Sequence, residues 1–324
     1  MNDLVSVCIP VYNGEEYLAD CLNSIINQTY NKVEILIIDD NSNDGSVTII
    51  KKFQARDSRI RLIINDRNLG AVHNWNKCIE EAKGNWIKFV FQDDLISSMG
   101  IEKMLSCCFK NNVSVCICSR DFIIEDSASP FLKEYFTDGV FKIEEHFTAP
   151  KKITPLEFAS LVKDKLFINI IGEPIVLLFQ KKCIERIGRY NYDLVQLVDY
   201  EFVMRLCLNM DSMFLPEKLL KFRVHGGSVS NKQNNEKNII KKNFIEPLLL
   251  FHEYIFSSYF KILRESIGRF QLFKMAVEFY DKNKNRYSVS PKMIRYIKWK
   301  YKGIWLIQNG RSIVKQRFIV NKLK

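Results

Sequence analysis

Four short apolar runs recur at near-regular intervals in the first part of the chain and constrain its fold more than any other feature. They occupy residues 5–9, 33–38, 60–64 and 86–91. The segments between them place apolar side chains three or four residues apart, as an amphipathic helix requires; one such set is Leu18, Cys21, Leu22, Ile25 and Ile26. Alternating apolar strands and helices predict an α/β fold with a mainly parallel sheet flanked by helices.

Polar residues follow each of the four predicted strands. Ligands of such sheets bind beyond the carboxyl ends of the strands, so these residues are candidates for a site. Asn, Asp and Gly are also the commonest turn residues, and any one cluster is compatible with an ordinary loop. Their convergence on one edge favours a polar pocket built from the following segments: Pro10 to Gly14, Asp39 to Ser42, Asn65 to Gly70 and Gln92 to Asp94.

The stretch KFVFQDDL ends the fourth strand in two adjacent carboxylates, Asp93 and Asp94. Like charges placed together cost free energy unless a cation neutralises them, and paired carboxylates suit Mg²⁺ or Mn²⁺. The alternative is a solvated turn with a helix that begins at Asp94 or Ser97. The sequence has no GxxxxGK[ST] and no GxGxxG motif, so a nucleotide here is not held by either glycine-rich loop.

The rest of the chain predicts further strands and helices with less regular spacing. Thr154 and Glu157 form a capping box, with Pro155 at the first helical position. The other expected elements are a strand at 113–119, an irregular segment at 121–152, two short strands within 168–179, helices at 181–187 and 199–209, strands at 213–215 and 219–224, a linker at 228–242 and helices beyond it.

Composition excludes a disordered or membrane-spanning chain. With 324 residues, 47% of them hydrophobic, the chain can bury one large core and has room for an appendage. Its nine cysteines are expected to act as small core residues in a reducing compartment. The N-terminus lacks the features of a signal peptide, and no stretch reaches the roughly 18 apolar residues of a membrane span. We therefore expect a cytoplasmic protein.

The positive charge is concentrated at the C-terminus. Residues 291–324 contain ten Lys or Arg and no Asp or Glu, and the remainder is balanced, with 38 basic and 37 acidic residues. Trp299 and Trp305 lie among these cations. The pattern is typical of segments that lie on an anionic membrane surface. A nucleic-acid contact is less well supported, since no recognised module accompanies the charge, and a helical cap with a solvated basic face is the structural alternative.

Several longer segments resemble family 2 glycosyltransferases, which are inverting enzymes of the GT-A fold that use nucleotide sugars. The resemblance covers about residues 4–230, and its segments are VSVCIPVYNGEEYLADCLNSIINQTYNKVEILIIDDNSNDGS, RNLGAVHNWNKCIEEAKGNWIKFVFQDD, IGEPIVLLFQKKCIERIGRYN, DYEFVMRL and FRVHGGSVS. It implies a GT-A domain at 1–230, with a nucleotide-binding half at 1–119 and an acceptor-binding half at 120–230. A basic, aromatic-rich helical extension at 231–324 would follow.

The resemblance also assigns roles in nucleotide and metal binding. Pro10, Tyr12 and Asp40 would contact the base, with Asp40 accepting a hydrogen bond from a ring N–H, which favours UDP. Asn68 and Gly70 would shape the nucleotide-facing loop. Asp94 would bind Mn²⁺ or Mg²⁺, and Asp93 would lie near the ribose or the metal. One departure is Gln92, at a position where family members often carry an acidic residue.

Three further residues receive roles by the same resemblance. Asp199 matches the base that deprotonates the acceptor hydroxyl, although its usual acidic neighbour is Val198 here. Glu173 would face the acceptor or donor sugar, the alternative being a strand-end turn set by Pro174. His225 would supply a further metal or diphosphate contact, the alternative being an ordinary loop residue.

These expectations together describe a metal-dependent inverting glycosyltransferase. It would move a sugar from a nucleoside-diphosphate donor to a lipid-linked saccharide acceptor. The reaction would serve surface polysaccharide or glycan synthesis at the inner face of the cell membrane. The alternative is a catalytically silent nucleotide-sugar or saccharide-binding protein at the membrane. A sugar-phosphate nucleotidyltransferase would need a glycine-rich basic loop after the first strand, which PVYNGEEY does not provide.

Overall fold

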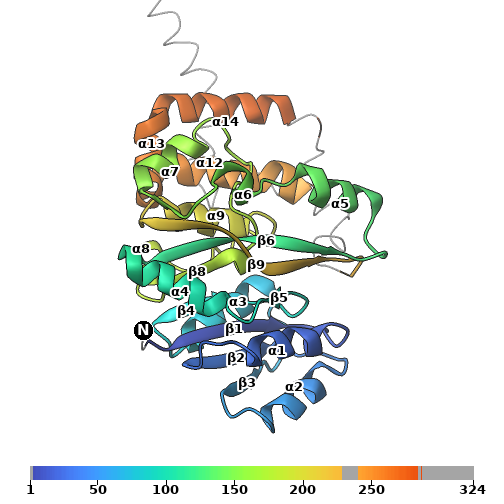
Figure 1. The fold of residues 1–324 in the computed structure, drawn as a ribbon. Helices are drawn as coiled ribbons and strands as arrows, with labels where there is room; N and C mark the ends of the chain where they lie inside the picture. Colours follow the sequence, from blue (N-terminus) through green and yellow to red (C-terminus); the bar gives the residue numbers. More distant parts are fainter. Residues whose placement is uncertain (1–2, 228–239, 284–285, 287–324) are drawn as a thin grey trace, which may run out of the picture. The chain divides into compact units, whose positions relative to one another are not determined.

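The chain forms two compact units in a computed structural model that describes residues 3–227, 240–283 and 286 (Figure 1). The first unit comprises Met1–Pro155 and Asn169–Ser228, and the second comprises Leu156–Ile168 and Val229–Lys324. The sequence division at residue 230 places 156–168 with the first region, whereas this segment clusters with the second unit. The predicted linker at 228–242 lies mostly outside the described residues, and the predicted membrane-binding tail at 291–324 lies entirely outside them.

The first unit is built on one mixed sheet with the strand order β3-β2-β1-β4-β8-β6-β9-β5, and β7 pairs with β9. Its first four strands are parallel, and they are β1 (Val5–Val11), β2 (Val33–Asp39), β3 (Ile60–Ile64) and β4 (Trp86–Phe89). The others are β5 (Leu95–Ile96), β6 (Val115–Ile124), β7 (Lys151–Ile153), β8 (Leu177–Gln180) and β9 (Ser212–Val224). The mixed α/β sheet predicted from the sequence is confirmed.

The strand order reverses between β1 and β4. The chain moves outward from β1 to β3 and then returns to place β4 on the other side of β1. Right-handed crossovers therefore put α1 (Leu18–Ile26) and α2 (Ser46–Gln54) on one face and α3 (Ala71–Glu81) on the other. Ligands of open α/β sheets bind at this kind of switch point, which here lies beyond the ends of β1 and β4.

Further helices complete the first unit, and the second unit is helical (Figure 1). The first unit also contains α4 (Gly100–Asn111), α5 (Pro130–Glu134), a π-helix (Tyr135–Gly139), α6 (Ile143–His146), α8 (Cys183–Ile187) and α9 (Val198–Cys207). The second contains α7 (Pro155–Val162), α12 (Glu246–Phe256), α13 (Lys261–Ile267) and α14 (Arg269–Asn283). Among the described residues, no helix has both the length and the apolar character needed to cross a bilayer.

Prolines explain two differences from the expected elements. The segment 168–179 forms one strand, β8, preceded by a 3₁₀ turn at Pro174–Val176, because Pro174 has no N–H to donate to a ladder. Conversely, β9 runs unbroken through Pro216, and the register shifts where Cys118, Ser119 and Arg120 pair with it. The bulge absorbs the proline, so two predicted strands are one.

The core of the first unit is apolar and contains most of the thiols. All seven residues of β1 are buried, as expected of a strand with helices on both faces. Every cysteine is free, and all but Cys107 are buried. The cysteines therefore pack as small apolar residues, which confirms the expectation from the sequence.

Lys88 is one of several charged residues buried in the first unit. It is fully buried on β4, and its ammonium group donates a hydrogen bond to the carbonyl of Ile175. Burial lowers the pKa of Lys88 to about 8, although Cys118, Cys116 and Asp94 oppose the shift. Between pH 8 and pH 10.5 the unfolded chain holds this proton while the folded protein releases it, so the stability rises with pH over this window.

Replacing Lys88 tests this charge burial. We expect the free energy of unfolding of Lys88→Met, relative to wild type, to fall by roughly 3 kcal/mol between pH 7 and pH 10.5. The reason is that only the wild type gains stability by releasing the buried proton. Urea unfolding across this pH range measures the difference. Lys110→Met, which removes an exposed lysine of α4, should show no such trend; a pH-independent difference for Lys88→Met would contradict the burial of a charge.

Candidate functional site

The loops that follow β1 and β2 are joined by hydrogen bonds. Asp39 ends β2 and accepts hydrogen bonds from the backbone N–H and the hydroxyl of Ser42 at 2.9 and 2.6 Å. The Ser42 hydroxyl in turn accepts from the Asn13 N–H, and the Ser46 hydroxyl accepts from the Gly14 N–H, both at 2.9 Å. The two loops are therefore a single rigid rim at the carboxyl edge of the sheet.

Asp40 fastens the loop after β3 to the same rim. Its side chain is buried, and its Oδ1 accepts hydrogen bonds from the Asn65 amide and the Leu69 N–H at 2.8 Å each. Its Oδ2 accepts from the Gly70 N–H at 2.8 Å. Gly70 adopts a φ of 88°, which favours glycine, and the Asn68 side chain accepts from the same N–H at 2.9 Å. The base contact predicted for Asp40 stays a prediction.

Tyr12 and Gln92 join the ends of β1 and β4. Gln92 accepts a hydrogen bond from the Tyr12 N–H at 2.8 Å, and its amide group donates to the Tyr12 carbonyl at 3.2 Å. The Tyr12 ring stays 43% exposed at this rim, and Pro10 is buried on β1 beside Ile38. Gln92 thus has a structural role at the position where the resemblance led us to expect an acidic residue.

Asp94 is a fully buried carboxylate with only one of its oxygens satisfied. Its Oδ1 accepts a hydrogen bond from the Arg223 N–H of β9 at 2.8 Å, and its Oδ2 has no hydrogen-bond partner. Burial and the adjacent Asp93 raise the pKa of Asp94 well above the usual range, while the Arg223 N–H opposes the shift. The protein therefore places an uncompensated acidic oxygen at the switch point.

Asp93, the neighbour of Asp94 in the chain, contacts His225. Oδ2 of Asp93 is 3.0 Å from Nε2 of His225, and the Arg223 guanidinium donates to the Asp93 carbonyl at 2.9 Å. The same guanidinium packs 4.5 Å above the Tyr17 ring, and the His225 ring meets Tyr17 edge-on at 4.8 Å. The end of β9 and the turn after β4 are therefore locked together around the carboxylate pair.

These side chains fit a divalent cation that shares its coordination with a ligand. The orphaned Oδ2 of Asp94 is a hard oxygen donor, and Asp93 and His225 add donors next to it. Within the described part of the chain, no three His, Cys, Asp or Glu side chains form a complete metal site. Ligand oxygens and water would therefore complete the shell, and the metal contacts of Asp93, Asp94 and His225 stay predictions.

Asp199 and Glu173 form the second part of the candidate site. Asp199 lies in the first turn of α9, where its Oδ1 accepts a hydrogen bond from the Tyr200 N–H at 2.7 Å. Glu173 pairs with Arg120, with 2.5 Å between Oε2 and Nε. Burial raises the pKa of Tyr135; Glu173 and Asp199 raise it further, and Arg120 opposes them. Glu173 thus acts electrostatically on Tyr135, and it also raises the pKa of Asp94.

Arg120 is the residue of this site that the sequence reasoning missed. It is almost fully buried on β6, within the run SVCICSRDF. An arginine in a mostly apolar strand was the available signal, since a buried guanidinium needs an acidic partner. The partner, Glu173, lies far away in sequence, and the pattern of a single strand does not reveal it.

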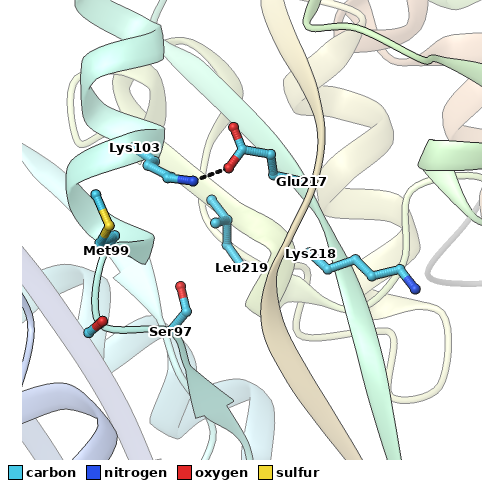
Figure 2. A pocket seen from close by; sticks show the side chains of 7 residues that line it. Ser97, Met99, Lys103, Glu217, Lys218 and Leu219 are labelled. Carbon is cyan, nitrogen blue, oxygen red and sulfur yellow. Dashed lines mark hydrogen bonds and ion pairs between the residues drawn. The ribbon is translucent and has the colours of Figure 1, made fainter.

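A surface pocket lies elsewhere in the first unit. It has a volume of about 360 Å³ and is lined by Ser97, Ser98, Met99, Lys103, Glu217, Lys218 and Leu219. Figure 2 shows Lys103 and Glu217 paired across it. None of the predicted site residues lines this pocket.

The hydrogen bonds that Asp40 accepts from the loop after β3 can be tested by substitution. In Asp40→Asn an amide nitrogen replaces one acceptor oxygen, so at least one of the three donors loses its hydrogen bond to residue 40, at a cost of about 1–3 kcal/mol where no other acceptor is near. We expect the amide protons of Leu69 and Gly70 to exchange at least roughly tenfold faster in the ligand-free protein, as measured by hydrogen-exchange NMR.

Asp66→Asn is the matched control, because it removes an exposed carboxylate from the same loop. Its exchange rates should equal those of the wild type. Unchanged exchange at Leu69 and Gly70 in Asp40→Asn would show that Asp40 does not hold this loop.

Comparisons with known proteins agree with this architecture. The family described as Glycosyl transferase family 2 matches residues 6–170. An uncharacterized glycosyltransferase of Haemophilus influenzae is 30% identical over 240 residues, which span 72% of this chain and 70% of the relative. The Escherichia coli protein WfgD, a UDP-Glc:alpha-D-GlcNAc-diphosphoundecaprenol beta-1,3-glucosyltransferase, is 32% identical over 53% of this chain and 65% of its own length.

Solved structures share the fold at low sequence identity. Staphylococcus aureus TarS, residues 1–349 in complex with UDP-GlcNAc, matches 86% of this chain and 72% of its own, with a TM-score of 0.62 and 18% identity. The mannosyltransferase PcManGT of Pyrobaculum calidifontis, in complex with GDP-Man and Mn²⁺, matches 97% of this chain and 84% of its own, with a TM-score of 0.54 and 14% identity. The chain therefore belongs to glycosyl transferase family 2, and it is a transferase with a GT-A-like fold rather than a silent binding protein.

Proposed function

We propose that this glycosyltransferase is metal-dependent and inverting, and that it moves a sugar from a UDP-sugar to a saccharide acceptor. The observation that carries the proposal is the buried Asp94 carboxylate, whose Oδ2 has no partner and which lies beside Asp93 and His225 at the switch point. Burying such a group costs free energy unless a cation compensates it. A function that needs a cation accounts for this cost.

The donor and acceptor classes follow from the relatives. WfgD is named for a UDP-glucose donor and a diphosphoundecaprenol-linked acceptor, and TarS binds UDP-GlcNAc. These names favour a UDP-sugar donor and a lipid-linked saccharide acceptor for this chain, in surface polysaccharide or glycan synthesis. PcManGT, with GDP-Man and Mn²⁺, supports the use of a divalent metal.

Asp94, Asp93 and His225 would hold the Mn²⁺ or Mg²⁺ ion. When bound, the ion neutralises the charge that develops on the departing nucleoside diphosphate. Pro10, Tyr12 and Asp40 would face the base, and the loop of Asn68 and Gly70 would lie along the nucleotide. The hydrogen bonds from Tyr12 to Gln92 and from Gly70 to Asp40 make this rim rigid before the donor arrives, so little ordering entropy is lost on binding.

Asp199 would perform the proton transfer of the reaction. Its carboxylate accepts the proton of the acceptor hydroxyl as the hydroxyl oxygen attacks the anomeric carbon. The bond from that carbon to the diphosphate oxygen breaks in the same displacement, and the diphosphate leaves with the electron pair. A single in-line displacement inverts the anomeric configuration, and Glu173 would bind a hydroxyl group of the acceptor or donor sugar.

The site of action would be the inner face of the cell membrane, with the protein in the cytoplasm. This part of the proposal rests on the sequence of residues 291–324, which lie outside the described residues. Their ten cations would each contribute about 1 kcal/mol near an anionic bilayer. A lipid-linked acceptor is presented at that same surface, so the two features agree.

Removing the Asp94 carboxylate should stabilise the metal-free protein and abolish its response to metal. In the wild type, Asp94 binds its proton more tightly in the folded protein than in the unfolded chain. The ionised carboxylate therefore lowers the stability of the fold as the pH rises above 3.8, the usual pKa of this group. Asp94→Asn lacks this cost and should melt at a higher temperature at pH 7. The wild type should gain roughly 5 °C with saturating UDP and Mn²⁺, and the variant should gain none.

Asp126→Asn removes a fully exposed carboxylate and should retain both wild-type responses. Differential scanning calorimetry with and without UDP and Mn²⁺ measures the two effects. A metal-dependent shift that persists in Asp94→Asn would remove Asp94 from the metal site.

Asp199→Asn should separate donor binding from transfer. An amide cannot take the acceptor proton, so we expect transfer to fall roughly 100-fold or more while the affinity for the donor changes less than about twofold. A panel of nucleotide sugars, tested with Mn²⁺, identifies the donor, and titration calorimetry measures its binding.

Asp164→Asn, an exposed position in the second unit, is the control and should keep full transfer. Unchanged turnover in Asp199→Asn would exclude Asp199 as the base. Proton NMR of the first product formed reports its anomeric configuration, and net retention would rule out a single displacement.

A further inference from the structure

We propose that Phe131 and Tyr135 form a platform on which a neutral pyranose ring of the acceptor stacks, and that Arg120 positions Glu173 to bind that sugar through a hydroxyl group. This inference rests on the proposed function, because it names the acceptor class of the same site. It adds three residues, Phe131, Tyr135 and Arg120, to those suggested by the resemblance.

The platform is a pair of exposed, nearly parallel aromatic rings. The planes of Phe131 and Tyr135 differ by 14°, their centroids are 6.2 Å apart, and the side chains are 71% and 45% exposed. Aromatic surface left in water is a cost that a bound apolar face recovers. Tyr135 begins a π-helix, a rare conformation that is frequent at functional sites.

The ring of Tyr135 is supported by a cluster of aromatic side chains. Phe136 meets it edge-on at 5.1 Å and packs against Phe122 on β6 and Phe222 on β9, at 5.4 and 5.5 Å. A Cβ atom on Gly139 would come within 3.1 Å of the Tyr135 ring, so the π-helix closes tightly over it. A supported ring offers a stacking surface with little conformational entropy to lose on binding.

Arg120 and Glu173 supply the polar edge of this site. The Arg120 guanidinium packs against the backbone of Gly172, whose φ is 111° and where an added Cβ would lie 2.6 Å from it. Arg120 is only 3% exposed, and its Nη2 is buried without a hydrogen-bond partner. Its Nε and Oε2 of Glu173 are an ion pair at 2.5 Å, but neither atom makes a hydrogen bond of good geometry. A sugar hydroxyl can accept from the Nη2 N–H and donate to the Glu173 carboxylate, which satisfies both groups.

The charge balance selects a neutral sugar. The carboxylates of Glu173 and Asp199 and the single guanidinium of Arg120 all act on the Tyr135 hydroxyl. Two carboxylates and one guanidinium leave a net negative charge, and the carboxylate of a uronate would meet like charge there. A neutral pyranose meets no such repulsion, and its C–H face suits the aromatic pair.

The test is an NMR titration of the full-length protein with simple glycosides, run both with and without UDP and Mn²⁺. The probes are methyl glucoside, methyl N-acetylglucosaminide and methyl glucuronide. We expect the neutral glycosides to bind at least roughly tenfold more tightly than the glucuronide. Tyr135→Leu should weaken neutral glycoside binding roughly tenfold and leave the affinity for UDP unchanged. Glu173→Gln should also weaken neutral glycoside binding roughly tenfold.

Phe109→Leu is the matched control, since Phe109 is an exposed aromatic residue on α4 that packs against Trp86. It should bind glycosides as the wild type does. Arg120→Lys keeps the charge but loses the planar guanidinium group, so it should weaken glycoside binding without altering the UDP affinity, which separates positioning from a general loss of structure.

The inference is overturned if Tyr135→Leu binds neutral glycosides as tightly as the wild type, if the glucuronide binds best, or if no glycoside binds. These outcomes are separate from a failure of the proposed function. That failure would appear as UDP binding that does not depend on Mn²⁺ and Asp94, whatever the glycosides do.

Discussion

A buried carboxylate at the end of β4 is the interaction on which the arrangement of the first unit depends. The Oδ1 atom of Asp94 is held by the N–H of Arg223 on β9, and the Arg223 side chain returns to the carbonyl of Asp93. The turn after the parallel strand β4 is thereby joined to β9, the last strand of the sheet in sequence order. Because the second oxygen of Asp94 is left without a partner, the same contact that closes the fold also creates the candidate cation site.

The periodicity of the sequence predicted the parallel half of the sheet because its strands and helices satisfy local rules. The run around Val5–Val11 is buried throughout, and the expected face of Leu18–Ile26 is the one that the structure buries. Polar residues at the ends of these strands were predictable for the same reason, since parallel strands bring their carboxyl ends to one edge. This reasoning found Asp40, Asp93 and Asp94 without knowledge of their partners.

Tertiary contacts determined what the sequence could not predict. Pro216 reads as a strand break, but the bulge opposite Ser119 lets β9 continue through it. Arg120 and Glu173 lie on separate elements, and only the assembled sheet shows that they form a pair. The hydrogen bonds of Asp40 to the Leu69 and Gly70 amides also depend on how two loops meet, which no local pattern encodes.

Glu173 links the two parts of the candidate site electrostatically. It raises the pKa of Asp94 at the proposed cation site and that of Tyr135 at the proposed acceptor site. Under the proposed function, a cation beside Asp94 would compensate the negative charge on that side and leave Glu173 and Asp199 as the excess charge facing the acceptor. As ionised carboxylates, both can accept hydrogen bonds from hydroxyl groups, and Asp199 can accept a proton. Filling the donor side first would therefore prepare the acceptor side for a neutral sugar.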